Sequence, residues 1–160
     1  QQMISYAAQL GADCAFFMDA DTENPIPAYA TGIGDIITPM KPLECLRGKY
    51  LVLIKPNVAV STKEAYKGIT PRKPEETPSV SVLRPMKEWK EWLTIDFEAS
   101  IFPLLPVLKE VKDALYEAGA IYASMSGSGS TVFGIFDTMP DISRQTKLSS
   151  SDYYAKTIRL

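Results

Sequence analysis

The chain has 160 residues, 46% of them hydrophobic, which is enough for one sizeable hydrophobic core. Its 17 basic and 19 acidic residues nearly balance and form no long run of either sign, so a nucleic-acid backbone or an anionic membrane is not an expected partner. Histidine is absent, which leaves carboxylates, lysines and hydroxyls for any proton transfer.

The two cysteines, Cys14 and Cys45, lack the C-x-x-C spacing of a zinc site or disulfide framework. We therefore expect the protein to be located in a reducing cytoplasm. No apolar run approaches the ~20 residues that span a bilayer, and the N-terminus lacks the layout of a signal peptide. The chain begins at Gln1 rather than at methionine, and its first residues already have helical spacing. We therefore interpret it as part of a longer protein.

The first third of the chain predicts short elements. Helical spacing over residues 3–10 ends at Gly11, and the apolar residues 14–18 predict a short buried strand. A polar loop follows, and two strand-like runs around Gly32 and Gly34 predict a tight hairpin. The dense run of β-formers over residues 49–56 predicts a strand at the centre of a sheet.

The rest of the chain predicts a mixture of helices and strands. Ser61 and Glu64 have the capping-box spacing, which indicates a short helix over 61–68. Residues 69–78 contain three prolines and predict a loop. Further helices are expected at 86–93, 97–102 and 104–118, and strands at 120–125, 131–137 and 153–160. This order favours an α+β fold, with helices on one face of a sheet.

Alternating glycines and serines at residues 126–130 precede an apolar strand and are the most informative local motif. Glycine lets successive backbone N–H groups converge, and the hydroxyls add donors, so the motif is suited to bind an anion such as phosphate. It lacks the lysine of a P-loop and does not open a helix. A flexible hairpin turn is an equally good interpretation of the local pattern.

Other candidate residues have structural interpretations that are at least as good as functional ones. Asp13 stands before an apolar run and is more typical of a helix cap than of a base. Thr62 and Tyr66 lie one helical turn apart and could face one cleft, although packing is the default for such a tyrosine. Trp89 and Trp92 are interpreted as the edge of a core.

Five segments, taken together and in order, resemble one family. They are LGADCAFFM, ATGIGDIITPM, LVLIKPNVAVSTKEAYKG, DFEASIF and GAIYASMSGSGSTVFGIF, and they cover most of residues 10–136. The family is that of the 4-diphosphocytidyl-2-C-methyl-D-erythritol kinases, in the GHMP kinase superfamily. The resemblance implies a GHMP kinase C-terminal domain over residues 1–160 with a ferredoxin-like sheet, in which residues 1–40 include the end of the N-terminal domain.

The resemblance also implies a function and a site. The expected activity is ATP-dependent phosphorylation of the 2-hydroxyl of the cytidine-bearing substrate in the non-mevalonate isoprenoid pathway, with ATP and Mg²⁺ as cofactors of the full-length enzyme. Asp13 matches the catalytic carboxylate, and Thr62 and Tyr66 match the cytidine pocket. Ser126, Gly127, Ser128, Gly129 and Ser130 match the glycine-rich loop. No residue of this chain is expected to be a metal ligand.

Departures from the family limit what the chain does alone. Ala15, Asn57 and Ile95 stand where the family has proline, glycine and asparagine. The glycine-rich loop that holds the ATP phosphates and an early lysine are not in the sequence. We therefore expect the isolated chain to be inactive and to need the N-terminal half of the protein as its partner. Self-association of the isolated chain is also expected to be possible.

The expected location is the cytoplasm of a bacterium, or a plastid in a plant. A non-catalytic α+β module that binds a small anion is the alternative; an RNA-contacting domain is disfavoured by the charge balance.

Overall fold

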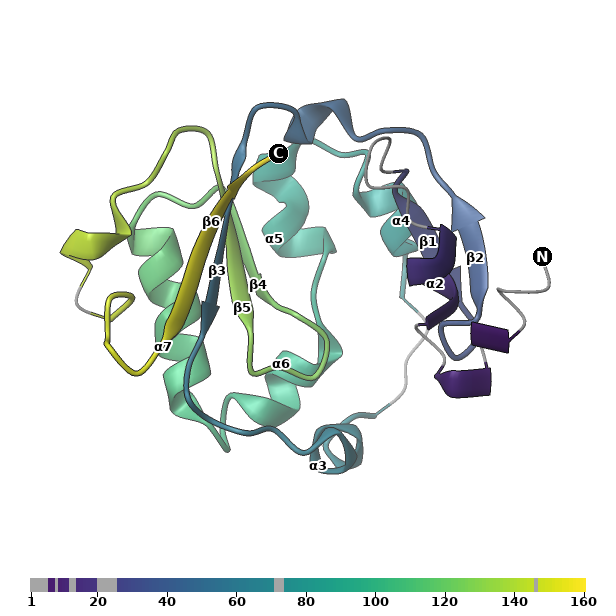
Figure 1. The fold of residues 1–160 in the computed structure, drawn as a ribbon, viewed down its shortest axis with the longest axis horizontal. Coiled ribbons are helices and arrows are strands. Elements are labelled where there is room, and N and C mark those ends of the chain that lie inside the picture. The colour runs from purple at the N-terminus through teal and green to yellow at the C-terminus, as the bar shows by residue number, and fades with distance from the viewer. Residues whose placement is uncertain (1–5, 8, 12–13, 20–25, 71–73, 146) are drawn as a thin grey trace. The chain divides into compact units, whose positions relative to one another are not determined.

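The computed structural model describes residues 6–7, 9–11, 14–19, 26–70, 74–145 and 147–160 (Figure 1). The chain divides into two compact units, residues 1–44 and 45–160.

Unit 1 contains helix α2 (Cys14–Asp19) and a two-stranded sheet of β1 (Ala28–Thr31) and β2 (Ile36–Pro39). The strand predicted at residues 14–18 is wrong, because this segment is α2. The Cys14 N–H donates to the Gly11 carbonyl at 3.0 Å, and the Phe17 side chain is 70% exposed. A short apolar run does not distinguish a strand from a helix, and here local hydrogen bonding decides for the helix.

The predicted hairpin of unit 1 is confirmed. Strands β1 and β2 pair antiparallel, with Thr31 opposite Ile36. Gly32 and Gly34 have φ values of 69° and 101°, which side chains rarely adopt, and the Ile33 N–H donates to Asp35 Oδ1 at 3.1 Å. The turn therefore depends on residues that the sequence pattern already singled out.

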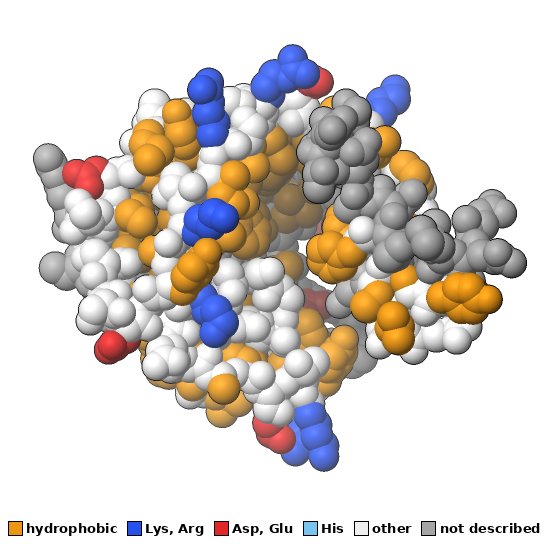
Figure 2. All heavy atoms as spheres, viewed as in Figure 1, with side chains coloured by type: hydrophobic (Ala, Val, Ile, Leu, Met, Phe, Trp, Pro, Cys, Tyr) orange, Lys and Arg blue, Asp and Glu red, His pale blue; other side chains and the backbone are white. Residues whose placement is uncertain are grey.

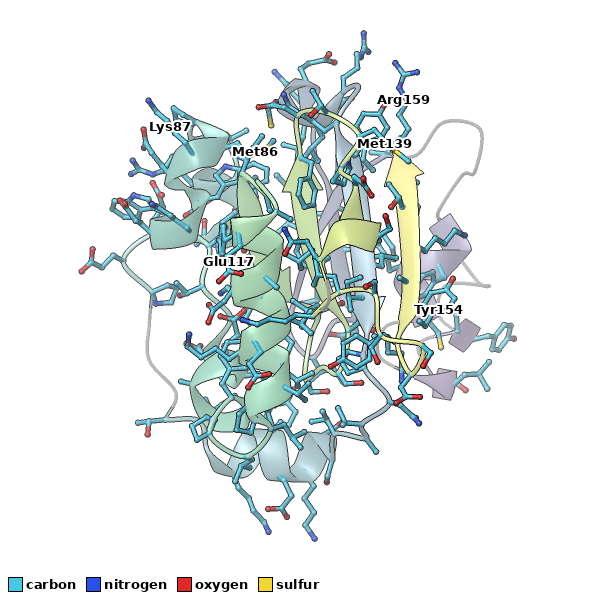
Figure 3. All side chains as sticks on the ribbon, turned by 90° about the vertical axis from the view of Figure 1, so that its left-hand side faces the viewer. Met86, Lys87, Glu117, Met139, Tyr154 and Arg159 are labelled. Carbon is cyan, nitrogen blue, oxygen red and sulfur yellow. The ribbon has the colours of Figure 1, made fainter. Side chains whose placement is uncertain are left out.

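Unit 2 is built on a four-stranded antiparallel sheet in the order β4-β5-β3-β6. Its strands are β3 (Tyr50–Lys55), β4 (Tyr122–Met125), β5 (Val132–Phe136) and β6 (Tyr154–Arg159). This order, with the first strand inside and the last at an edge, is the ferredoxin-like arrangement. The central position predicted for β3 is confirmed, and Figure 3 shows β6 as the outer strand between Tyr154 and Arg159.

Helix α7 (Pro106–Glu117) covers one face of this sheet, and α6 (Asp96–Ile101) adds Ile101 to the same core (Figure 1). Pleating points alternate side chains of β3 toward α7, so Val52 and Ile54 are fully buried there. The helix contributes a stripe at helical spacing: Leu108, Val111, Ala114 and Leu115. The α+β class, with α6 and α7 packed on one face of the sheet, is therefore confirmed, but short helical segments also pack on part of the other face.

The opposite face is covered in part by the 3₁₀ segment η2 (Met86–Glu88), which continues into α5 (Trp89–Trp92). The rings of Trp89 and Tyr122 meet edge-on with centroids 5.7 Å apart. Trp92 is partly exposed, with the Arg84 guanidinium 3.9 Å from its ring centroid. The two tryptophans are therefore a core edge, as predicted, and one predicted helix is two short segments.

Four short helical segments complete the described part of unit 2 and its border. They are η1 (Glu44–Leu46), α3 (Thr62–Lys67), α4 (Pro78–Ser81) and η3 (Ile142–Arg144). Helix α4 begins at the last residue of the predicted loop, where proline occupies the first helical position, which tolerates its missing N–H.

The surface is consistent with the balanced composition. On the face shown in Figure 2, the described Lys and Arg side chains are spread among hydrophobic and polar atoms rather than joined into one basic surface. No helix in the described ranges is both long enough and apolar enough to cross a membrane. Cys14 and Cys45 are both free.

Candidate functional site

The glycine turn joins β4 to β5 at one end of the sheet. The Ser126 N–H donates to the Thr131 carbonyl at 2.8 Å, and the Gly129 N–H donates to the Ser126 carbonyl at 3.0 Å. Gly127 and Gly129 have φ values of 56° and 91°. A Cβ atom on Gly129 would lie 2.9 Å from Met125 Sδ, so this position needs glycine for space as well as for backbone conformation. The turn is thus a specifically folded loop rather than a generic flexible hairpin.

Helix α3 presents the two residues predicted to contact substrate. Ser61 caps the helix by accepting from the Glu64 N–H at 3.4 Å, which confirms the predicted N-cap, while the Glu64 carboxylate pairs with Lys67. Thr62 and Tyr66 both project to the surface, and the Tyr66 side chain remains 65% exposed. An aromatic ring that is this exposed can accept a flat ligand.

The structure brings α3 and the glycine turn together. Thr62 Oγ1 lies 3.4 Å from Ser128 Oγ, although the residues are 66 positions apart. An open pocket of about 490 Å³ lies next to this contact, within the ~300–1,000 Å³ range typical of small-ligand sites. It is lined by Tyr66, Ile69, Thr94, Ile95, Asp96, Phe97 and Gly127. Aromatic and aliphatic walls with few polar groups suit a planar ring such as a nucleobase.

Helix α6 supports the aromatic side of the pocket. Phe97 meets the Tyr66 ring edge-on, with centroids 5.0 Å apart and planes at 89°. Ser100 Oγ donates to the Ala65 carbonyl at 3.1 Å, which ties α6 to α3. The position of Tyr66 is therefore set by α6, a helix that begins 30 residues later in the sequence.

Glu98, also on α6, is a residue to which sequence reasoning assigned no role. Glu98 Oε1 accepts from Ser124 Oγ at 3.1 Å and from the Met125 N–H at 2.9 Å, while Oε2 accepts from Lys112 Nζ at 2.6 Å. Its side chain is only 14% exposed. The sequence feature that could have pointed to Glu98 is its spacing. Glu98 stands three residues before the buried Ile101 and therefore lies on the inward side of the helix.

The predicted site residues thus divide into two groups. Thr62, Tyr66 and the turn residues Ser126, Gly127, Ser128 and Gly129 lie on the surface of unit 2 in or beside one pocket, and Ser130 is buried at the end of the turn. Asp13 lies outside the described residues, so its predicted role and its predicted proximity to the turn stay predictions. Within the described ranges, no group of three or more Cys, Asp or Glu residues is arranged to hold a metal ion.

Comparison with known proteins finds a family match over part of the chain. Residues 80–152 match the family described as GHMP kinases C terminal. The chain is 49% identical over 143 residues to a 4-diphosphocytidyl-2-C-methyl-D-erythritol kinase of Bacteroides thetaiotaomicron, a match that covers 88% of this chain and 50% of the relative. The corresponding kinase of Parabacteroides distasonis is 44% identical over 148 residues and covers 92% of this chain.

Solved structures of kinases have a similar fold. A crystal structure of a 4-(cytidine 5'-diphospho)-2C-methyl-D-erythritol kinase superposes with a TM-score of 0.69 at 26% identity, over 97% of this chain and 56% of that one. Homoserine kinase from Cytophaga hutchinsonii, with a TM-score of 0.52 at 19% identity, shares the fold.

The fold and the family match define the class of this part of the protein, which is a GHMP kinase C-terminal domain. Within that class it is similar over most of its length to the 4-diphosphocytidyl-2-C-methyl-D-erythritol kinases, as its motifs predicted. The chain spans about half the length of the curated relatives it matches.

Proposed function

We propose that the protein to which this chain belongs is an ATP-dependent kinase that phosphorylates the 2-hydroxyl of 4-diphosphocytidyl-2-C-methyl-D-erythritol, in the non-mevalonate route to isoprenoid precursors. The observation that carries the proposal is the contact of Thr62 with Ser128 at 3.4 Å, beside a pocket with an aromatic wall. A cytidine diphosphate combines a flat base with a charged diphosphate. The two surfaces that meet at this contact match these two chemistries.

In this proposal unit 2 holds the substrate. The exposed ring of Tyr66 stacks on the cytosine, and stacking of this kind is worth about 1–3 kcal/mol per base. The left-handed glycines of the turn give its backbone the geometry of anion-binding nests, which suits it to phosphate oxygens. Thr62 offers a hydroxyl between the two.

Phosphoryl transfer requires mainly positioning and charge stabilisation from a protein. Asp13 is proposed as the carboxylate that orients or deprotonates the substrate hydroxyl. The loop that binds the ATP phosphates and the early lysine are proposed to come from another part of the same protein, and Mg²⁺ is proposed to accompany ATP. We place the activity in the bacterial cytoplasm, because the relatives are bacterial and ATP is the phosphoryl donor.

The test uses the intact protein with ATP and Mg²⁺. It compares three acceptors: 4-diphosphocytidyl-2-C-methyl-D-erythritol, its uridine analogue, and 2-C-methyl-D-erythritol 4-phosphate, which lacks the nucleotide. ADP release is measured by a coupled assay, and the product by ³¹P NMR. We expect turnover with the cytidine compound, with a new phosphomonoester signal, and at least ~10-fold lower kcat/KM with the other two. Equal turnover of the acceptor without nucleotide would contradict the proposal.

The rival interpretation, a non-catalytic module that binds a small anion, predicts a different result. In that case the intact protein would release no ADP with any of the three acceptors. Calorimetry would instead detect binding of cytidine diphosphate or inorganic phosphate that is unaffected by ATP.

A further inference from the structure

Glu98 joins three separate elements of unit 2. From α6 it accepts hydrogen bonds from Ser124 and Met125 of β4 and from Lys112 of α7, at distances of 2.6–3.1 Å. Met125 is the last residue of β4, and the glycine turn begins at the next residue. The carboxylate thus binds the chain directly before the turn.

The bond from Met125 matters because β4 is an edge strand. Within the sheet β4 pairs only with β5, so its outward-facing N–H groups need partners from outside the sheet. Met125 is completely buried, so water cannot replace Glu98 as its acceptor. A buried N–H without an acceptor is unfavourable, and the strand end would shift to find one.

The same helix also supports the other side of the pocket. Phe97, next to Glu98, packs against Tyr66, and Ser100 bonds to the Ala65 carbonyl of α3. Glu98 is not one of the residues that line the pocket, to which α6 contributes Asp96 and Phe97. Helix α6 is therefore a common support: Ser100 and Phe97 fix the aromatic wall, and Glu98 fixes the start of the turn.

The geometry points to Glu98 as a positioning residue that sets the distance between the glycine turn and the aromatic pocket, and thereby the affinity for the cytidine-bearing substrate. This inference rests on the proposed function. The decisive feature is the acceptor oxygen offered to Met125. The ion pair with Lys112 orients the carboxylate but does not itself reach the strand.

The test compares variants of the intact protein in the kinase assay, below the melting temperature of the least stable one. Glu98→Met keeps the side-chain volume but removes the acceptor, and we expect KM for the cytidine substrate to rise at least ~10-fold, with a smaller change in kcat.

Glu98→Gln keeps an oxygen for Met125, and Lys112→Met removes only the ion pair. Lys112→Met and the double variant Glu98→Gln/Lys112→Met are expected to stay within ~3-fold of the wild-type KM; in the double variant the new amide NH2 no longer faces a second donor, the Lys112 ammonium. Asp113→Asn is the matched control. It breaks the exposed ion pair between Asp113 and Lys109, which lies on α7 like Lys112 and has the same 2.6 Å length as the pair of Lys112 with Glu98.

The outcomes separate the inference from the proposed function. A wild-type protein that does not phosphorylate the cytidine substrate ends the proposed function, whatever the variants do. With an active wild type, a folded Glu98→Met variant with unchanged KM overturns the positioning role. If Glu98→Met does not fold, the double variant Glu98→Gln/Lys112→Met decides: a KM raised ~10-fold or more, with Lys112→Met normal, would show that the charge rather than the acceptor matters.

Discussion

Gly68 lies so close to Ser100 that a Cβ atom on the glycine would sit 2.4 Å from Ser100 Cβ and 3.3 Å from its Cα. Gly68 is the C-cap of α3, and its φ of −84° is available to any residue. Space rather than backbone conformation therefore requires glycine here. The close approach lets α3 and α6 pack directly, and the contact between Tyr66 and Phe97 depends on that packing.

Gly68→Ala is expected to force the two helices apart. Overpacking of this kind costs typically about 1–3 kcal/mol, and the melting temperature of the intact protein should fall accordingly. Adding Ser100→Gly to Gly68→Ala removes the clashing atom and should recover part of the loss, although it also removes the hydrogen bond to the Ala65 carbonyl and adds a helical glycine, which costs about 1 kcal/mol. A Gly68→Ala variant as stable as wild type would show that the helices separate without cost.

The two glycines of the turn should respond differently to alanine. Both have positive φ, and left-handed backbone costs an alanine about 1–2 kcal/mol. A Cβ on Gly127 would meet no atom within 4 Å, whereas a Cβ on Gly129 would meet Met125 and Val60. We therefore expect Gly129→Ala to lower the free energy of unfolding more than Gly127→Ala does, measured by urea titration. The reverse order would contradict the geometry of the turn.

Tyr66→Ala should weaken substrate binding, because the exposed ring is lost from the pocket wall. A stacking contribution of about 1–3 kcal/mol corresponds to a rise in KM of roughly 5- to 150-fold, with kcat less affected. Tyr66→Phe retains the ring and the edge-on contact with Phe97, so it serves as the control. An unchanged KM in Tyr66→Ala would return this residue to a packing role.

Asp13→Asn tests the catalytic assignment that comes from the family resemblance. Loss of an acid–base group commonly lowers turnover about 10²-fold or more, and we expect that fall in kcat with little change in KM. Calorimetric binding of cytidine diphosphate should be preserved. A variant that turns over at the normal rate would remove Asp13 from the reaction.

Tyr122 should make the protein sensitive to alkaline pH. Burial raises the pKa of Tyr122 to about 12, from an ordinary value of about 10. Between these two pH values the native state keeps a proton on Tyr122 that the unfolded state has lost. The contribution of Tyr122 to the free energy of unfolding is therefore complete below pH about 10 and decreases as the pH rises toward 12. The slope from this residue is at most about 1.4 kcal/mol per pH unit.

Urea unfolding of Tyr122→Phe between pH 9 and 11 checks this expectation. Phenylalanine cannot ionise, so the alkaline loss should be smaller, on a lower baseline because the hydrogen bond of Tyr122 to the Leu93 carbonyl, 2.7 Å long, is gone. Burial also raises the pKa of Tyr116, and Tyr116→Phe provides the comparison. An alkaline slope identical to wild type in Tyr122→Phe would assign the effect to other groups.

Several elements were readable from the sequence because they depend on local interactions. The Ser61 cap, the glycines of the hairpin and the apolar run of β3 each follow from the conformational preferences of a few neighbouring residues. Where local signals conflict, the prediction failed: residues 14–18 have the composition of a strand, yet form α2. Helix α4, with only four residues, was too short to give a periodic signal.

By itself the sequence determined the class of fold, the family and the turn that forms one edge of the site, since these are written in short, ordered motifs. Only the tertiary structure decided that Thr62 meets Ser128, that Phe97 supports Tyr66, and that Glu98 holds the end of β4. These pairs join residues 27–66 positions apart. No local preference encodes such contacts, because they arise when burial of the core brings separate elements together and buried polar groups must then find partners.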